Sequence, residues 1–383
     1  MKFVSKHKPQ IARTAGLRPS RAGFTLVEML VAVALVVLMM MMFVTVFQMA
    51  TESFGTQRGI AENDQRARTL TTIMRADIFR RTVRGRNGNG LQPYTLNESR
   101  LEFGRTDGYF FVSENLPEND TDDVLQFTVR IDPSKREPFY GKAAPIPGAT
   151  RNQPVWDDGD PTNKSGTSIA AEIVYFLRNG NLYRRLLLIR KPLVPGEAQP
   201  DGLLGASNFW GEFDYSASYD AGSGNVQFHD EAWLTNDLNQ TITQTLGLRK
   251  NRFGFNHDDS KSREFDTNGT FFGRFTHEET SHANFQYPTT AANNPMDETT
   301  GSNPSTFANG SRRGEDILMT EVHSFDVKLW NGTAYVNSDF DTGHPNDAGS
   351  TGGSAKAIRI TIRYFDVTSE QFRQLTIDKS LLD

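Results

Sequence analysis

An apolar run from Met29 to Met49 constrains this chain more than any other feature, and only Thr45 and Gln48 interrupt it. A helix rises about 1.5 Å per residue, so the run is long enough to cross a hydrocarbon core of about 30 Å. The first 23 residues contain six lysines and arginines and no acid. Because basic flanks stay on the cytoplasmic side of a membrane, we expect a single-pass protein with a cytoplasmic N-terminus and an extracytoplasmic C-terminal part.

Glu28 is an unusual residue because it places a carboxylate at the start of this apolar run. A charged group at the centre of a bilayer costs about 2.5–3.5 kcal/mol even on a lenient scale, and such groups normally have a partner or a function. No basic residue lies near Glu28 on its apolar side. Glu28 is therefore a candidate functional residue whose partner must be sought elsewhere.

The segment Arg21–Glu28, with the sequence RAGFTLVE, resembles the prepilin signature of type IV pilins and of the pseudopilins of type II secretion systems. The resemblance implies that a prepilin peptidase cuts between Gly23 and Phe24 and that Phe24 becomes N-methylated. Glu28 would then be the fifth residue of the mature chain and would pair with the terminal ammonium of a neighbouring subunit during assembly. An ordinary secretory signal has a shorter apolar region, and a plain anchor requires neither Glu28 nor the Gly-Phe step.

The helix is expected to continue beyond the membrane, because no proline occurs between Phe24 and Leu91. We expect one helix from Phe24 to about Val83, with a transmembrane part at residues 24–50 and an amphipathic continuation at residues 51–86. The resemblance to the prepilin signature implies that residues 1–23 form a leader that is removed. The amphipathic part carries an apolar stripe at helical spacing, which would face a domain core: Ala67, Leu70, Met74 and Ile78.

Residues 87–383 predict an extracytoplasmic domain rich in antiparallel strands, with a loop-rich insertion at about 192–314. The clearest signals are a hairpin of Ala170–Arg178 and Leu182–Arg190, joined by an Asn-Gly turn, and the alternating strand Ala357–Phe365. Within the insertion, Tyr287–Ser311 predicts a loop. Further strands are expected at Arg100–Phe103, Tyr109–Ser113, Val124–Ile131, Arg249–Phe255, Gly269–Phe275, Leu318–Trp330, Ala334–Val336 and Gln371–Ile377.

The expected fold class is therefore α+β, with a long N-terminal hydrophobic helix packed on antiparallel β-sheets. This corresponds to a pilin-like fold with a long insertion. Several blocks resemble the J-type minor pseudopilin of type II secretion systems: Met74–Arg81, Ile173–Leu177, Leu182–Arg185, Leu318–Trp330 and Ala357–Ile360.

That resemblance implies a minor subunit at or near the tip of a filament that acts in protein secretion. Its partners would be other pseudopilins or minor pilins, the prepilin peptidase, the assembly platform and, before assembly, membrane lipid. The location would be the bacterial inner membrane, with the C-terminal domain in the periplasm and later in a periplasmic filament. The insertion at about 192–314 departs from the J-type pattern. Two alternatives stay open: a minor type IV pilin for adhesion, motility or DNA uptake, and an anchored exported enzyme or binding module.

Other function classes find little support in the residues. The net charge of −5 gives no basic surface for nucleic acid, and the absence of cysteine excludes disulfides and thiolate sites. No Gly-x-Ser-x-Gly elbow or P-loop is present, and the two histidines of His277–His282 are five positions apart, whereas the zinc-protease motif requires four. We expect no enzyme activity, no cofactor and no metal, with calcium at Glu118–Asp123 or Asp157–Asp160 as an alternative.

Overall fold

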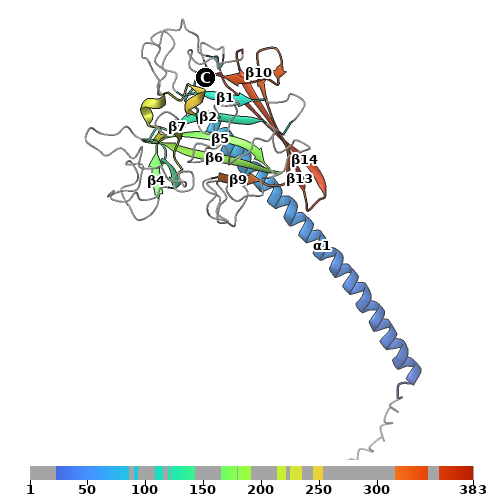
Figure 1. Cartoon of the computed structure of the whole chain (residues 1–383). Coiled ribbons are helices and arrows are strands. Elements are labelled where there is room, and N and C mark those ends of the chain that lie inside the picture. The colour runs from blue at the N-terminus through green and yellow to red at the C-terminus, as the bar shows by residue number, and fades with distance from the viewer. Residues whose placement is uncertain are drawn as a thin grey trace, which may run out of the picture. The chain divides into compact units, whose positions relative to one another are not determined.

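The computed structural model of the chain divides into two compact units, residues 1–58 and residues 59–383, called the anchor unit and the head unit below. Helix α1 (Leu26–Phe79) belongs to both units (Figure 1). The strands expected at Arg100–Phe103 and Gly269–Phe275 and the loop Tyr287–Ser311 lie outside the described residues. The structure describes residues 23–85, 90–93, 108–114, 120–121, 123–142, 165–178, 180–190, 214–220, 225–234, 245–252, 315–343 and 353–382.

In the anchor unit, α1 presents its large apolar side chains to the surroundings on all sides. Their exposed fractions range from 48% for Val37 to 81% for Leu26. The helix is long and apolar enough to cross a membrane. A helix that is apolar all round is stable only when lipid or other protein covers it, so this segment requires a covering that the chain itself does not supply among its described residues.

In the head unit, the same helix buries one stripe. Leu70, Met74 and Ile78 are each at most 1% exposed, and Ala67 packs beside them, which confirms the predicted apolar face. Burying a large aliphatic side chain contributes about 1.5–3 kcal/mol. Three such residues on successive turns therefore fix which face of α1 points to the core of the head.

The helix ends at Phe79, about four residues before the end predicted at Val83. The backbone of the next residues pairs with a strand instead: the amide of Thr82 donates to the carbonyl of Thr128 at 2.9 Å, and the amide of Arg130 donates to the carbonyl of Arg80 at 2.9 Å. These bonds satisfy the chain after the helix better than another helical turn exposed to solvent would.

The larger sheet has six strands in the order β12-β1-β2-β5-β6-β9, and the pairings are antiparallel. The predicted hairpin is confirmed: β5 and β6 pair over nine positions, and the turn contains Gly180 with a φ of 71°. Only glycine adopts such an angle without strain. The strands are β12 (Phe340–Asp341), β1 (Phe110–Ser113), β2 (Val124–Arg130), β5 (Ala170–Arg178), β6 (Asn181–Ile189) and β9 (Glu315–Met319).

The smaller main sheet has four strands in the order β11-β10-β13-β14, again antiparallel. Along β13, Ile358, Ile360 and Ile362 are fully buried, and the residues between them are half-buried or exposed. This confirms the predicted alternation. The strands are β11 (Tyr335–Val336), β10 (Val322–Trp330), β13 (Ala357–Asp366) and β14 (Gln371–Ser380).

Two sequence predictions of strands were wrong. The single strand expected at Leu318–Trp330 is divided between β9 and β10, which belong to different sheets. Glu321 between them has a φ of 55°, and a left-handed residue cannot continue a strand. The start of the strand expected at Arg249–Phe255 is instead a 3-10 helix, η2 (Arg249–Asn251).

The described parts of the insertion attach to the larger sheet. The backbone of Leu188 in β6 exchanges hydrogen bonds with Asp214 and Ser216, and that of Arg190 does so with His229 and Glu231. Beyond these residues lie a short hairpin and a 3-10 turn, β7 (Ala217–Asp220), β8 (Asn225–Phe228) and η1 (Glu231–Leu234). A second hairpin pairs β3 (Phe139–Lys142) with β4 (Ser165–Ser168).

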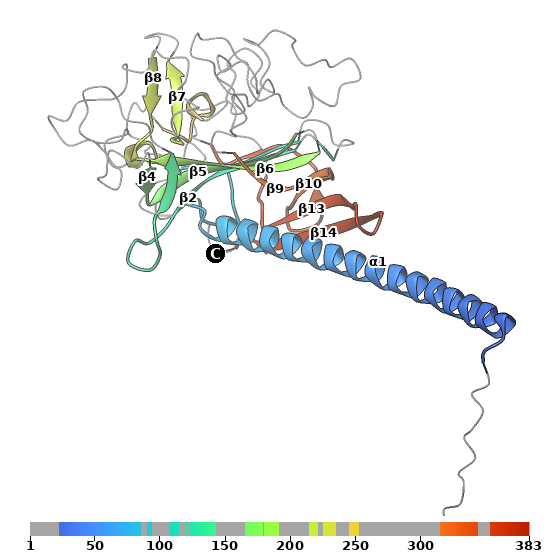
Figure 2. The same ribbon diagram turned by 90° about the horizontal axis from the view of Figure 1, so that it is seen from below.

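The head therefore has layers on both faces of the larger sheet, as Figure 2 shows with α1 on one side and β7 and β8 on the other. The main core lies between the helix and both sheets. A smaller core lies where the insertion covers the sheet, and it includes Tyr109, Ile189, Trp233 and Leu246. The fold is an α+β arrangement of one long apolar helix with antiparallel sheets, consistent with a pilin-like fold.

Candidate processing and assembly site

The candidate cleavage position lies just before the helix. Residues 23–25 are not helical, and α1 begins at Leu26. Gly23 is exposed, and a Cβ added to it would have no heavy atom within 4 Å among the atoms considered. Phe24 is 83% exposed. An exposed peptide bond outside a helix is accessible to an enzyme, whereas a bond inside a helix is held by its hydrogen bonds.

Thr25 and Glu28 form a capping box at the start of the helix. The amide of Glu28 donates to Oγ1 of Thr25 at 3.2 Å, while the amide and hydroxyl of Thr25 donate to Oε2 of Glu28 at 2.9 and 3.1 Å. The two side chains thereby satisfy backbone donors that have no partner inside the helix. Our sequence analysis missed Thr25, although the spacing T-x-x-E before an apolar run is the recognised signature of this box.

The capping box gives Glu28 a local structural role but does not compensate its negative charge. Among the described residues, the polar contacts of Glu28 are those with Thr25, and its side chain is exposed. The two hydrogen bonds that the carboxylate accepts from Thr25 do not neutralise its charge. A charge that enters an apolar environment still needs a cation close by, and the structure places no basic side chain on Glu28 within the part of the chain that it describes.

A family model for the prokaryotic N-terminal methylation motif matches residues 18–44, the segment that contains Gly23, Phe24 and Glu28. The chain is thus type IV pilin-like in its N-terminal segment, and its one long apolar helix suits a membrane-anchored protein of that class. Proteins with this motif are in general processed by a prepilin peptidase and assemble with other pilin subunits as structural components. No curated protein matches the chain at a significant level.

Three of the blocks that resemble the J-type pseudopilin meet around Asp77 in the head. Asp77 is buried, with an exposed fraction of 1%. It accepts hydrogen bonds from the hydroxyl of Tyr175 at 2.5 Å and from Nε of Arg184 at 2.8 Å. Burial and then the charge of Asp77 raise the pKa of Tyr175 well above its ordinary value. This buried group joins α1 to β5 and β6, so these three residues serve to position the helix on the sheet.

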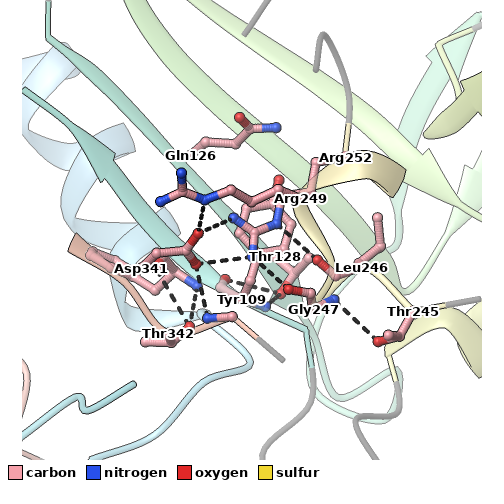
Figure 3. A network of polar contacts seen from close by, with 12 residues as sticks. Tyr109, Gln126, Thr128, Thr245, Leu246, Gly247, Arg249, Arg252, Asp341 and Thr342 are labelled. Carbon is pink, nitrogen blue, oxygen red and sulfur yellow. Dashed lines mark hydrogen bonds and ion pairs between the residues drawn. The ribbon is translucent and has the colours of Figure 1, made fainter. Parts of the chain in front are cut away.

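A second buried network joins the insertion to the sheet (Figure 3). Arg252 holds both carboxylate oxygens of Asp341 at 2.8 and 2.9 Å, and Nε of Arg249 donates to the same carboxylate at 2.6 Å. The guanidinium of Arg252 also lies 3.9 Å from the centre of the ring of Tyr109. A bidentate, desolvated pair of this kind is strongly directional, so it fixes the orientation of the insertion on β1 and β12.

Glu172, Ser216 and His229 lie together, but their arrangement is structural. The hydroxyl of Ser216 is 2.7 Å from Oε2 of Glu172 and 2.7 Å from Nδ1 of His229, and the three residues are fully buried. A nucleophile must be reachable by its substrate, and this serine is not. Burial, followed by the charge of Arg190, lowers the pKa of His229 to about 3, so the imidazole is neutral at ordinary pH.

The described part of the chain includes some of the acidic residues that were considered as calcium ligands. Of the predicted acidic runs, Asp157–Asp160 lies outside the described residues, and so do Glu118, Asn119 and Asp122 of Glu118–Asp123. Asp123 is buried, and one carboxylate oxygen each of Asp123, Glu114 and Asp326 lie within 4.8 Å of one another. The ammonium of Lys328 is 2.7 Å from Asp326, so a cation of the chain already serves this cluster. His277–His282 also lies outside the described residues.

Proposed function

We propose that this chain is a minor pseudopilin of a type II secretion system, which is extracted from the inner membrane into a short periplasmic filament and acts at or near its tip. The observation that supports this most directly is the apolar helix of the anchor unit. It combines the methylation motif with side chains that nothing in the described chain covers. Such a helix is soluble only in lipid or against similar helices.

In this proposal, prepilin peptidase cuts the peptide bond between Gly23 and Phe24 and methylates the new amine. Glu28 then pairs with the terminal ammonium of a neighbouring subunit. The capping box survives this cut, because it uses the amide of Thr25 rather than that of Phe24. Glu28 would therefore keep its orientation at the helix start while its carboxylate accepts a hydrogen bond from the incoming ammonium. This pairing would set the axial register between subunits.

The J-type assignment rests on the blocks around Asp77, whose side chains hold the helix against the sheet. A minor type IV pilin remains the second candidate, because the same methylation motif serves both classes. Co-purification separates the two: a secretin-linked set of sibling pseudopilins supports the secretion role, whereas a partner set that includes a retraction ATPase supports the pilus role. In either case the chain would act as a structural subunit.

The test is the intact mass and N-terminal residue of the chain after co-expression with its prepilin peptidase. We expect a product that begins at N-methylated Phe24, and a Gly23→Val variant that stays at full length. Gly23→Val adds a side chain where the structure has open space, so loss of cutting would reflect recognition rather than misfolding. A product that begins at Met1 in both chains would contradict the proposal.

A further inference from the structure

The two main sheets end in four edge strands of very different length. Strands β11 and β12 have two residues each, and β9 has five. Strand β14 has ten, all paired with β13 without a register shift. Among the described strands, none pairs with the outer edge of β14. A long, flat edge exposes a row of unpaired N–H and C=O groups, which natural proteins usually blunt or use.

A groove of about 880 Å³ lies beside this edge. Its helix wall is built mainly from short side chains, so the space next to the strand is not filled. The volume is far larger than a single water requires and lies within the range of about 300–1,000 Å³ that is usual for ligand-binding pockets. The residues that line it include Ala67, Arg68, Thr71 and Thr72 of α1 and Gln374 and Leu375 of β14.

The strand and the helix run side by side in the same direction. Near the start of β14, Arg373 contacts Asp64 at 2.9 Å, and near its end Nζ of Lys379 lies 5.3 Å from the centre of the ring of Phe79. These contacts are about 22 Å apart along a helix and about 20 Å apart along a strand. Figure 2 shows β14 following α1 in this way. The helix thus forms a continuous wall beside the open edge.

The charge of this wall favours an acidic occupant. Asp64, the acid in the lining of the groove, is already engaged by Arg373, which also contacts Asp366 at 2.9 Å. Arg68 lines the groove and is exposed. Arg75 lies seven residues further along the same flank of the helix and is also exposed, and its charge acts on Asp378 of β14 as well. An extended segment with carboxylates at alternate positions would direct them towards these guanidinium groups.

We propose that the outer edge of β14 and the groove beside it receive an extended acidic segment of a partner protein, which adds a fifth strand to the sheet. The backbone of the segment would pair with β14, and its alternate side chains would enter the groove. This interaction surface lies wholly within the head unit. It does not depend on the processing of the N-terminus or on the secretion role.

The probe is a fluorescent ten-residue peptide of alternating valine and glutamate, titrated into the detergent-solubilised full chain and followed by anisotropy. We expect saturable binding, and at least a tenfold weaker affinity for the same peptide with N-methyl groups on every second amide. N-methylation leaves the side chains unchanged and removes the backbone donors along one edge. A lysine-for-glutamate peptide should also bind at least tenfold more weakly.

Two matched variants test the place of binding. Arg68→Glu should reverse the preference from the glutamate peptide to the lysine peptide, whereas Arg66→Glu, the same change two residues away and about 200° around the helix, should change little. Circular dichroism and thermal unfolding confirm that both variants keep the fold. Equal binding of the N-methylated peptide, or equal effects of the two variants, would overturn the proposal. So would self-association of the chain through β14 in place of peptide binding.

Discussion

Helix α1 carries two carboxylates in opposite circumstances, Glu28 in the anchor unit and Asp77 in the head unit. Glu28 is exposed, and its polar contacts among the described residues are local ones with Thr25. Asp77 is buried and held by Tyr175 and Arg184, which lie about 100 positions away in the sequence. The two residues lie on one continuous helix, yet among the described residues only Asp77 has partners from distant parts of the chain.

The difference indicates which parts of the helix are complete in the monomer. Around Asp77, apolar and polar surfaces of α1 are matched by the sheets, so this part of the helix belongs to a finished domain. Around Glu28, neither the carboxylate nor the apolar side chains are matched. Substitutions in the head unit are therefore expected to alter the stability of the fold, and substitutions in the anchor unit are expected to alter assembly. The following variants separate the two effects.

The largest effect on stability is expected from Asp77→Ala. It leaves the guanidinium of Arg184 buried beside Tyr175 without its carboxylate, and breaking a buried pair in this way costs about 3–5 kcal/mol. Urea unfolding followed by tryptophan fluorescence measures this loss. The control is Asp64→Ala, which removes an exposed pair with Arg373 and should cost at most about 1 kcal/mol. Equal losses in both variants would show that Asp77 does not fasten the helix to the sheet.

Glu28→Ala is expected to have the opposite profile. The head should unfold as in the unmodified chain, because Glu28 makes no described contact with it. Recovery with partner pilin subunits from membranes should fall at least tenfold, because an unpaired ammonium in an apolar filament core is costly. Immunoblots of sheared or cross-linked filaments provide the measurement. Normal incorporation of the alanine variant would remove the proposed role of Glu28.

A smaller effect is expected from His229, whose pKa is lowered to about 3 by burial and then by Arg190. The unfolded chain binds a proton at this residue below about pH 6.5, and the folded chain does not. The contribution of the neutral His229 to the free energy of unfolding is therefore fully present above pH 6.5. It is lost as the pH falls from 6.5 towards 3, by up to about 1.4 kcal/mol per pH unit. His229→Asn should flatten the pH dependence of the free energy of unfolding between pH 5 and 7; an unchanged slope would contradict a neutral buried imidazole.

The smallest effect is expected from Thr25→Val, which keeps the side-chain volume and removes the hydroxyl of the capping box. Loss of an N-cap costs about 0.5–2 kcal/mol, confined to the first turn of the helix. Hydrogen exchange in detergent micelles should accelerate for the first amides of α1 and stay unchanged in the head. Thr45→Val, in the middle of the apolar run, is the matched control. Unchanged exchange at the start of the helix in Thr25→Val would show that the box does not stabilise it.

Patterns that repeat along the chain allowed much of the fold to be predicted. The helix, the β5–β6 hairpin and the alternation of β13 follow from periods of 3.6 and 2 and from one Asn-Gly turn. The motif around Gly23 and Glu28 was readable in the same local way. Long-range partners could not be predicted in this way. Arg252 pairs with Asp341, which lies 89 positions further along the chain, and no local sequence pattern indicates this pairing. The strand predicted at Arg249 was wrong because these buried ion pairs and a 3-10 turn override a weak local preference.

The pairing of β1 with β12 bears on the order in which the head folds. The amide of Phe110 donates to Thr342, 232 positions further along the chain, so the larger sheet closes only when almost the whole polypeptide is available. Contacts of such separation slow folding, and the edge of β1 stays open in the meantime, which exposes it to mispairing. Because a chain is synthesised from its N-terminus, the long helix would be complete early and the head last. Holdase chaperones that cover this edge until synthesis ends would raise the yield of the folded chain.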